Sequence, residues 1–223
     1  MLHELDKNME KYTESMIKKA LSVAYDKAIN GFEVQGFKIL DSSFDLARDY
    51  SNPDRSVKQN ATSLINWQCT KAGVSGFATS LGGFACMAVG VPANITSVLY
   101  IQLRMIVAIA IMAGYDPHND KVQTFAYACL LGNSAGNVLK EVGMEITEKL
   151  TLSYIKKNVT REMLKKINDA TVPRLITKAG SKGIINLTKT VPVVSGIFGA
   201  GFDVFTTKGI GAAAKRMFID GKV

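Results

Sequence analysis

Arg104 is the residue whose surroundings in the sequence most plainly require a chemical explanation. It follows an uncharged run of 32 residues, 72–103. An arginine buried among apolar neighbours needs a partner, because an unpaired buried charge is costly. Asp203, just after the small residues 199–201, is the best candidate partner. Arg104 is therefore interpreted in one of three ways: as half of a structural ion pair, as a site for an anionic head group or carboxylate, or as a side chain that reaches solvent.

Three polar residues near Arg104 in the sequence complete a candidate ligand-binding set. They are Asn94, Tyr100 and Gln102. An enzyme acting on a lipid or a peptide would need these side chains, with Arg104 and Asp203, to converge on one pocket.

The histidines and the glycine-rich segments form no recognisable motif. Such residues often act as catalytic groups, metal ligands or phosphate-binding loops. His118 stands beside Asp116 and Asp120, but such a cluster around a proline is more typical of a solvated turn than of a metal site. With His3 as the other histidine, no Ser/His/Asp or Cys/His arrangement can be built. No G-x-x-x-x-G-K-[ST] motif is present. The sequence therefore predicts no catalytic residue, no metal and no cofactor. Three residues are interpreted as buried thiols in a reducing compartment: Cys69, Cys86 and Cys129.

The positive charge of the chain is concentrated in its last third. The 27 Lys and Arg residues against 19 Asp and Glu give a net charge of +8. Residues 1–60 carry −1, residues 61–145 carry 0 and residues 146–223 carry +9. This partition predicts contact with an anionic membrane surface rather than with a specific nucleic acid, since few aromatic residues lie among the cations. A solvated helix face is the simpler alternative. The residues predicted to bind the anionic membrane surface are Lys149, Lys156, Lys157, Arg161, Lys165, Lys166, Arg174, Lys178 and Lys182.

Helical periodicity dominates the sequence, and strand-like alternation is scarce. We predict an all-α chain that forms a single compact domain of about eight to ten helices, with Gly/Ala-rich central helices. The expected helices cover residues 4–29, 38–50, 54–71, 72–88, 92–113, 121–142, 144–168 and 210–219, with a basic segment at 174–189 and an uncharged one leading into Asp203.

The segment 92–113 is apolar almost all round, which indicates either a central core helix or a membrane-embedded one. Gln102 and Arg104 stand at its middle. An arginine at the centre of a lipid-facing helix costs about 2.5–3.5 kcal/mol on insertion scales. The sequence therefore favours a core helix, with membrane insertion of residues 72–113 as the alternative.

The ends of the sequence carry no recognisable targeting signal. The first residues are acidic and polar, unlike a secretory signal, and neither end carries a lipidation motif. We therefore expect a cytoplasmic protein, free or peripheral to the inner face of the cell membrane.

Two ordered blocks of motifs resemble the EcsC family. The first combines the glycines 76, 82 and 83 with Val91-Pro92-Ala93, Tyr100-Ile101-Gln102-Leu103-Arg104 and Ala113-Gly114-Tyr115-Asp116. The second runs from Val191-Pro192 through Gly199-Ala200-Gly201-Phe202-Asp203 to Ala214-Lys215-Arg216-Met217-Phe218, with Asp203 where the family usually has asparagine.

The resemblance implies a bacterial, helical protein that is suspected of membrane association. The family takes its name from an operon with an ABC transporter, so a membrane transporter is an implied partner. The similarity covers residues 60–219, the expected EcsC-like domain, and residues 1–59 are expected to be a helical segment that packs on it.

Three functions are compatible with these observations. The leading hypothesis is a non-enzymatic, peripherally membrane-associated protein that binds anionic lipid or an apolar ligand. The second is a soluble protein-interaction module linked to an ABC transporter or export system. The third is an enzyme acting on a lipid or a peptide.

Overall fold

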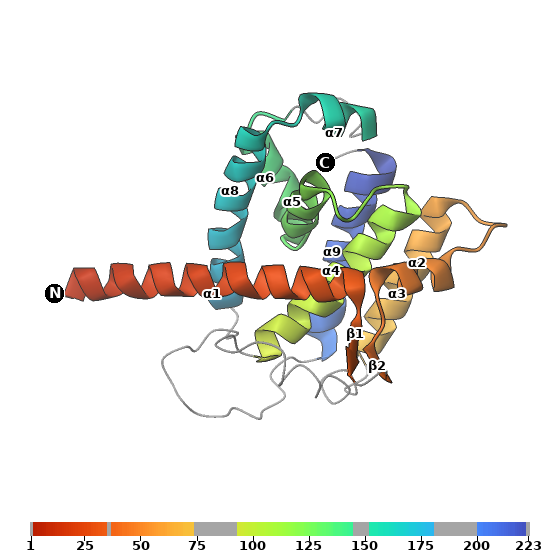
Figure 1. Cartoon of the computed structure of the whole chain (residues 1–223), viewed down its shortest axis with the longest axis horizontal. Coiled ribbons are helices and arrows are strands. Elements are labelled where there is room, and N and C mark those ends of the chain that lie inside the picture. The colour runs from red at the N-terminus through yellow and green to blue at the C-terminus, as the bar shows by residue number, and fades with distance from the viewer. Residues whose placement is uncertain (1, 35–36, 74–92, 145–151, 181–199, 222–223) are drawn as a thin grey trace.

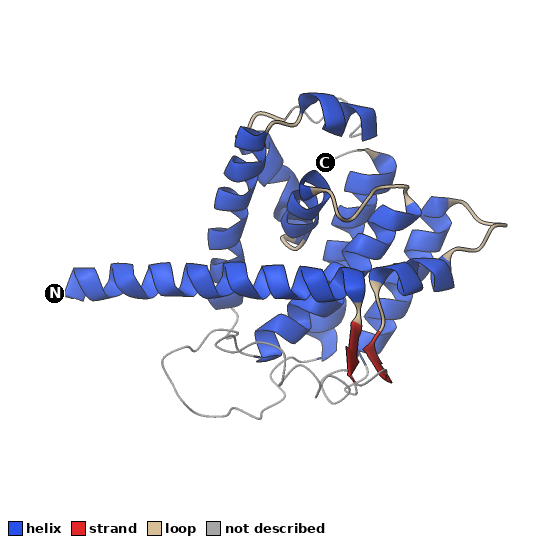
Figure 2. Cartoon of the chain, in the orientation of Figure 1, coloured by secondary structure: helices blue, strands red, loops and turns tan. Residues whose placement is uncertain are grey.

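The computed structural model describes residues 2–34, 37–73, 93–144, 152–180 and 200–221 (Figure 1). These residues form nine α-helices and one short two-stranded antiparallel sheet (Figure 2). The predicted all-α class is confirmed. The expected helix at 72–88 falls almost entirely on residues outside the described ranges, and so does the uncharged segment up to residue 199.

The N-terminal helix α1 (Leu2–Asn30) confirms the prediction for residues 4–29. Its N-terminal half projects from the body of the molecule, and Tyr12 is 60% exposed there (Figure 1). Its C-terminal half packs on the central helix α4 (Ala93–Met112). The buried residues recur every three or four positions, as one face of a helix requires: Ile17, Ala20, Leu21, Ala24, Tyr25 and Ala28.

The predicted helix at 38–50 was wrong in its first part. Strand β1 (Phe32–Val34) pairs with strand β2 (Phe37–Leu40), and helix α2 (Ser43–Tyr50) begins only after them. Ser42 sets this start through a capping box, in which its hydroxyl accepts from the Asp45 N–H and the Asp45 carboxylate accepts from the Ser42 N–H. The apolar residues before Ser42 therefore belong to the strand rather than to the helix.

Helix α4 forms the centre of the core. It is in contact with α1, α2, α3 (Val57–Gly73), α5 (Asp120–Cys129) and α9 (Ala200–Lys215). Because other helices surround α4, its sequence is apolar on nearly all sides. The predicted core helix is confirmed. Within the described ranges, no helix combines the length and the apolar character needed to span a bilayer. The α4 residues with at most 1% exposure include Leu103, Met105, Ile106, Val107, Ala108, Ile109 and Ala110.

Helices α3 and α9 form an antiparallel pair. Lys58 makes an ion pair with Asp220 at 2.7 Å, and one turn further along α3 the Lys215 ammonium donates to the Thr62 hydroxyl at 3.1 Å. Next, Ile65 lies against Gly211, where an added Cβ would be only 2.6 Å from the Ile65 Cγ1. Positions on α9 fall as those on α3 rise, so the last turn of α3 lies beside the first turns of α9.

The single helix predicted at 121–142 was also wrong. Helix α5 is followed by a 3₁₀ turn, η2 (Gly132–Ser134), and then by α6 (Ala135–Glu141). Gly132 has a left-handed φ of 64°, and a Cβ built there would lie 3.5 Å from the backbone carbonyl carbon of Gly209. The helix breaks because the chain turns at Gly132 while passing close to α9, a conformation that glycine adopts at no steric cost.

The predicted helix at 144–168 is replaced by two helices in its described part. Helix α7 (Leu152–Asn158) ends before Thr160, whose hydroxyl accepts from the Met163 N–H and caps helix α8 (Arg161–Gly180). Helix α8 continues past Pro173 into the expected basic segment. At the C-terminal end, the predicted helix at 210–219 is the end of α9 with a π-helical turn, η3 (Arg216–Asp220).

Candidate functional site

The half-buried Arg104 side chain lies against Tyr100, one turn earlier on α4. Its Nη1 donates to the Tyr100 hydroxyl oxygen at 3.3 Å, and its Cζ is 5.9 Å from the centre of the Tyr100 ring. The Tyr100 hydroxyl in turn donates to the backbone carbonyl of Asp41 at 2.7 Å. Arg104 is therefore held by an aromatic neighbour, and through it by the loop that precedes α2.

Helix α2 covers this part of α4. The Ser43 hydroxyl is buried and lies 2.7 Å from the carbonyl of Ala28 and 3.2 Å from the carbonyl of Arg104, which joins α1, α2 and α4. At the other end of α2, partial burial raises the pKa of Tyr50, Asp49 raises it further, and the positive charge of Arg104 lowers it. The positive charge of Arg104 therefore acts on the end of α2 as well as on Tyr100.

Arg104 makes no ion pair with any described carboxylate. The expected partner, Asp203, lies in α9, and the expected ligand residue Asn94 lies at the start of α4; both side chains are outside the described part of the structure. Gln102 is half-buried and stands two residues before Arg104, roughly 200° around the helix. The structure therefore brings Tyr100 to Arg104 and leaves Gln102 on another side of α4.

Replacing Arg104 with methionine should lower the free energy of unfolding by less than about 1 kcal/mol. Methionine keeps an apolar stem, and one hydrogen bond to a tyrosine contributes only modestly to stability. Removing one member of a buried ion pair typically costs about 3–5 kcal/mol. Urea unfolding of the parent and of R104M distinguishes the two cases, and a loss in the upper range would show that Arg104 has a buried anionic partner.

The basic residues that were predicted to bind an anionic membrane surface differ in their surroundings. Lys166 pairs with Glu162 at 2.8 Å, and Arg174 forms two bonds to the Glu141 carboxylate, at 2.7 and 2.8 Å. Lys166 also holds the pKa of the Glu162 carboxyl below its usual value. Three exposed cations make no described ion pair: Lys157, Arg161 and Lys165. The described structure gives no side-chain position for Lys149, Lys156, Lys178 and Lys182.

A hollow of about 220 Å³ lies between α1 and the loop from α4 to α5, a feature the sequence reasoning missed. The Tyr25 hydroxyl donates across it to the carbonyl of Pro117 at 2.8 Å, and burial raises the pKa of Tyr25 far above its usual value. His118, also at the hollow, is exposed and stacks on Phe44, with ring centres 6.3 Å apart. Among the described residues, no three His, Cys, Asp or Glu side chains are grouped so as to hold a metal ion.

Two of the three cysteines, Cys69 and Cys129, are buried thiols, as predicted. Burial is the main cause that raises the pKa of both Cys69 and Cys129, so the reactive thiolate form is disfavoured. Cys86 lies outside the described residues.

Sequence reasoning also missed Tyr50, Ser43 and Asp41 around Arg104, and the exposed Trp67 on α3. Only the packing of α2 on α4 brings the first three to the neighbourhood of Arg104 and Tyr100, and no spacing in the sequence indicates that packing. The sequence could have pointed to Trp67, because it is the only tryptophan and lies among polar residues of a predicted helix.

Comparisons with known proteins place the chain in a family. The comparison with curated proteins gave no match, and neither did the comparison with solved structures. The model of the EcsC protein family matches residues 1–219, which includes the N-terminal helices as well as both motif blocks. Because this match covers nearly all of the 223 residues, the chain belongs to the EcsC protein family.

Proposed function

We propose that this protein is a non-enzymatic, peripheral membrane protein that binds anionic lipid. The observation that carries the proposal is the division of charge, with +9 in residues 146–223 beside an apolar, neutral middle third. A basic surface next to apolar segments is suited to phosphate head groups over acyl chains, and each Lys or Arg near such a surface contributes about 1 kcal/mol.

Two features of the described structure support a binding role. Arg104 is partly exposed beside Tyr100, without a described carboxylate partner, so its remaining guanidinium donors suit a phosphate or carboxylate. The polar groups around it do not form the convergent set that an enzyme would require, since Gln102 lies on another side of α4. This arrangement favours recognition of an anion over chemistry on it.

Flotation of the purified protein with vesicles tests the proposal. We expect the protein to float with vesicles of phosphatidylcholine and phosphatidylglycerol at 0.15 M salt, and to float less at higher salt, because ions screen the attraction. Vesicles of phosphatidylcholine alone are the matched control. A protein that stays at the bottom of the gradient with both compositions would contradict the proposal.

A second candidate function is a soluble protein-interaction module serving a transporter or export system. The N-terminal half of α1 favours it, because this half projects from the body and exposes Tyr12 (Figure 1). This function predicts a monodisperse protein that is indifferent to both kinds of vesicle and that binds a transporter component through α1.

A further inference from the structure

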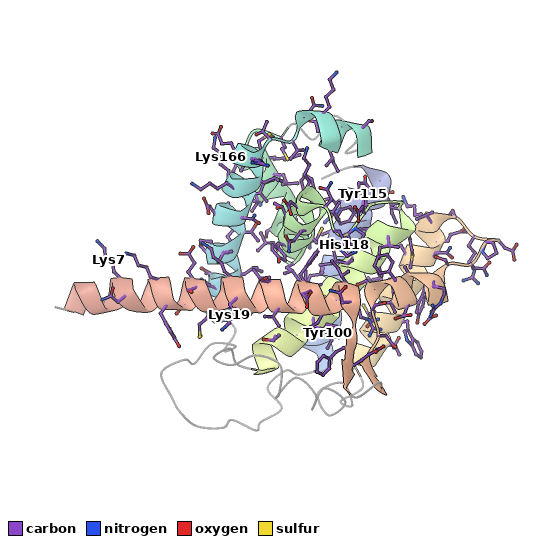
Figure 3. The ribbon with its side chains drawn as sticks, viewed as in Figure 1. Lys7, Lys19, Tyr100, Tyr115, His118 and Lys166 are labelled. Carbon is purple, nitrogen blue, oxygen red and sulfur yellow. The ribbon has the colours of Figure 1, made fainter. Side chains whose placement is uncertain are left out.

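The hollow of about 220 Å³ beside α1 has no part in the proposed function. Ser22, Asp26 and Asn30 line it from successive turns of α1. Gln123 lines it from the first turn of α5, and His118 from the loop between α4 and α5 (Figure 3). Its walls therefore come from three segments of the chain that meet only in the folded protein.

Contacts on two sides hold the loop beside α1. The buried Tyr25 donates its hydroxyl to the carbonyl of Pro117 at 2.8 Å, and its ring packs edge-on against Tyr127 with centres 5.6 Å apart. On the other side, the ring of His118 stacks on Phe44 of α2. Because α1, α2 and α5 all fix the loop, the hollow is formed before any ligand binds, as most small-molecule sites are.

The hydrogen-bonding groups that the lining leaves available are mainly acceptors. The Asn30 amide donates to the Asp26 carboxylate at 2.8 Å, and the Gln123 amide donates to the Tyr127 hydroxyl at 3.0 Å. Both amides use an N–H in these bonds, and no described hydrogen bond uses their carbonyl oxygens. The carboxylate oxygens of Asp26 also have further lone pairs. A ligand that carries several N–H donors therefore fits this lining.

The hollow carries a carboxylate on a chain whose net charge is +8. The Asp26 side chain is 55% exposed there, and the Lys27 ammonium 3.2 Å away offsets part of its charge. Burial is the main cause that raises the pKa of Tyr25, followed by a neighbouring tyrosine and by the negative charge of Asp116, so Asp116 also acts at the hollow. Lys121 donates to a carbonyl of α7 at 2.8 Å and is thereby directed away. A cation in the hollow would therefore be attracted by two carboxylates.

We propose that this hollow binds a small organic cation through a primary ammonium group. An ammonium has three N–H donors for the acceptors of Asp26, Asn30 and Gln123, and it needs one opposite charge nearby. A divalent metal ion takes about six to eight oxygen ligands, several of them carboxylates, whereas this lining holds one carboxylate. The volume exceeds the roughly 150 Å³ of a cavity that admits benzene, so a short alkyl chain also fits. The site is independent of the proposed function, which concerns anions.

Titration of the ¹⁵N-labelled full chain with butylammonium, in the absence of lipid, tests the proposal. We expect a Kd on the order of 1 mM, because two or three charge-assisted hydrogen bonds in an open hollow support no tighter binding. The largest amide shifts should fall within residues 22–30 and 117–123, which line the hollow. Butan-1-ol has the same chain length without the charge, and it should leave these amides unshifted.

Three variants test the role of the carboxylate. D26N keeps the shape of the side chain without its charge and should weaken binding about tenfold. S22K places an ammonium one turn from Asp26, where the two can pair, and should abolish binding. D54N removes an exposed carboxylate from the turn between α2 and α3, and it should bind as the parent does. Circular dichroism checks that all three are folded. Equal shifts with butan-1-ol, shifts located elsewhere, or parental affinity in D26N or S22K would overturn the proposal.

Discussion

Replacing Phe125 with alanine should lower the free energy of unfolding by about 3–5 kcal/mol. Phe125 in α5 has no exposed surface, and it belongs to one continuous core cluster. The loss combines the transfer of a large aromatic side chain to water with the cavity that remains. Because small domains are stable by only about 5–15 kcal/mol, the variant should be close to unfolding at 37 °C.

F125A also tests whether residues 1–59 unfold together with the rest of the chain or as a separate unit. Leu21 and Tyr25 of α1 lie in the same cluster as Phe125, so residues 1–59 should lose structure together with the rest. Urea unfolding followed by Trp67 fluorescence and by far-UV circular dichroism should give coincident curves for F125A. Y12A, at a position 60% exposed, is the control and should change stability by less than about 0.5 kcal/mol. Two separate transitions would show that α1 folds independently.

Replacing Gly211 with leucine should lower the free energy of unfolding by about 1–3 kcal/mol or more. A Cβ at this position would meet the Ile65 Cγ1 at 2.6 Å and Cγ2 at 2.9 Å. Both carbons are attached directly to the Ile65 Cβ, and a β-branched side chain in a helix has essentially one rotamer, so it cannot move aside. The α3–α9 pair would have to separate, which would expose Ala61, Leu64 and Ile65.

The control lies two residues earlier on the same helix. A Cβ on Gly209 would meet nothing within 4 Å, and its φ is not left-handed, so G209A should raise stability by about 0.5–1 kcal/mol. I65A should restore part of the stability lost in G211L, because it removes the clashing carbons. Thermal unfolding of the four proteins measures both effects. If G209A and G211L lowered the melting temperature equally, α3 would not pack on Gly211.

Helix positions were well predicted where one apolar face decides them. In α1 the spacing of buried residues from Ile17 to Ala28 follows the helical period, and the sequence shows that period directly. The predicted helix boundaries were wrong where one local contact decides where a helix begins or ends. Ser42 starts α2 after a strand pair, and Gly132 turns the chain beside Gly209 on α9. The strand pairing and the contact at Gly132 depend on chain segments that meet only in the folded protein.

The candidate site was predicted in part for a similar reason. Arg104 could be singled out from the sequence, because a lone cation in an apolar segment has few physical explanations. Its surroundings could not be, since the Asp41 carbonyl binds the Tyr100 hydroxyl beside it, and Tyr50 comes within its electrostatic influence, only through the folding of α2 onto α4. The expected ion pair with Asp203 stays a prediction, because the Asp203 side chain is outside the described residues.

The sequence by itself determined the all-α class, the family, the central helix and the division of charge, because composition and periodicity are local properties of a chain. Only the tertiary structure decided which charges share a surface. The antiparallel α3–α9 pair brings Lys58 to Asp220, while Glu162 and Glu141 offset two cations of α8. Coulomb interactions depend on distance in space and are screened within about 8 Å, so a count along the chain cannot locate them.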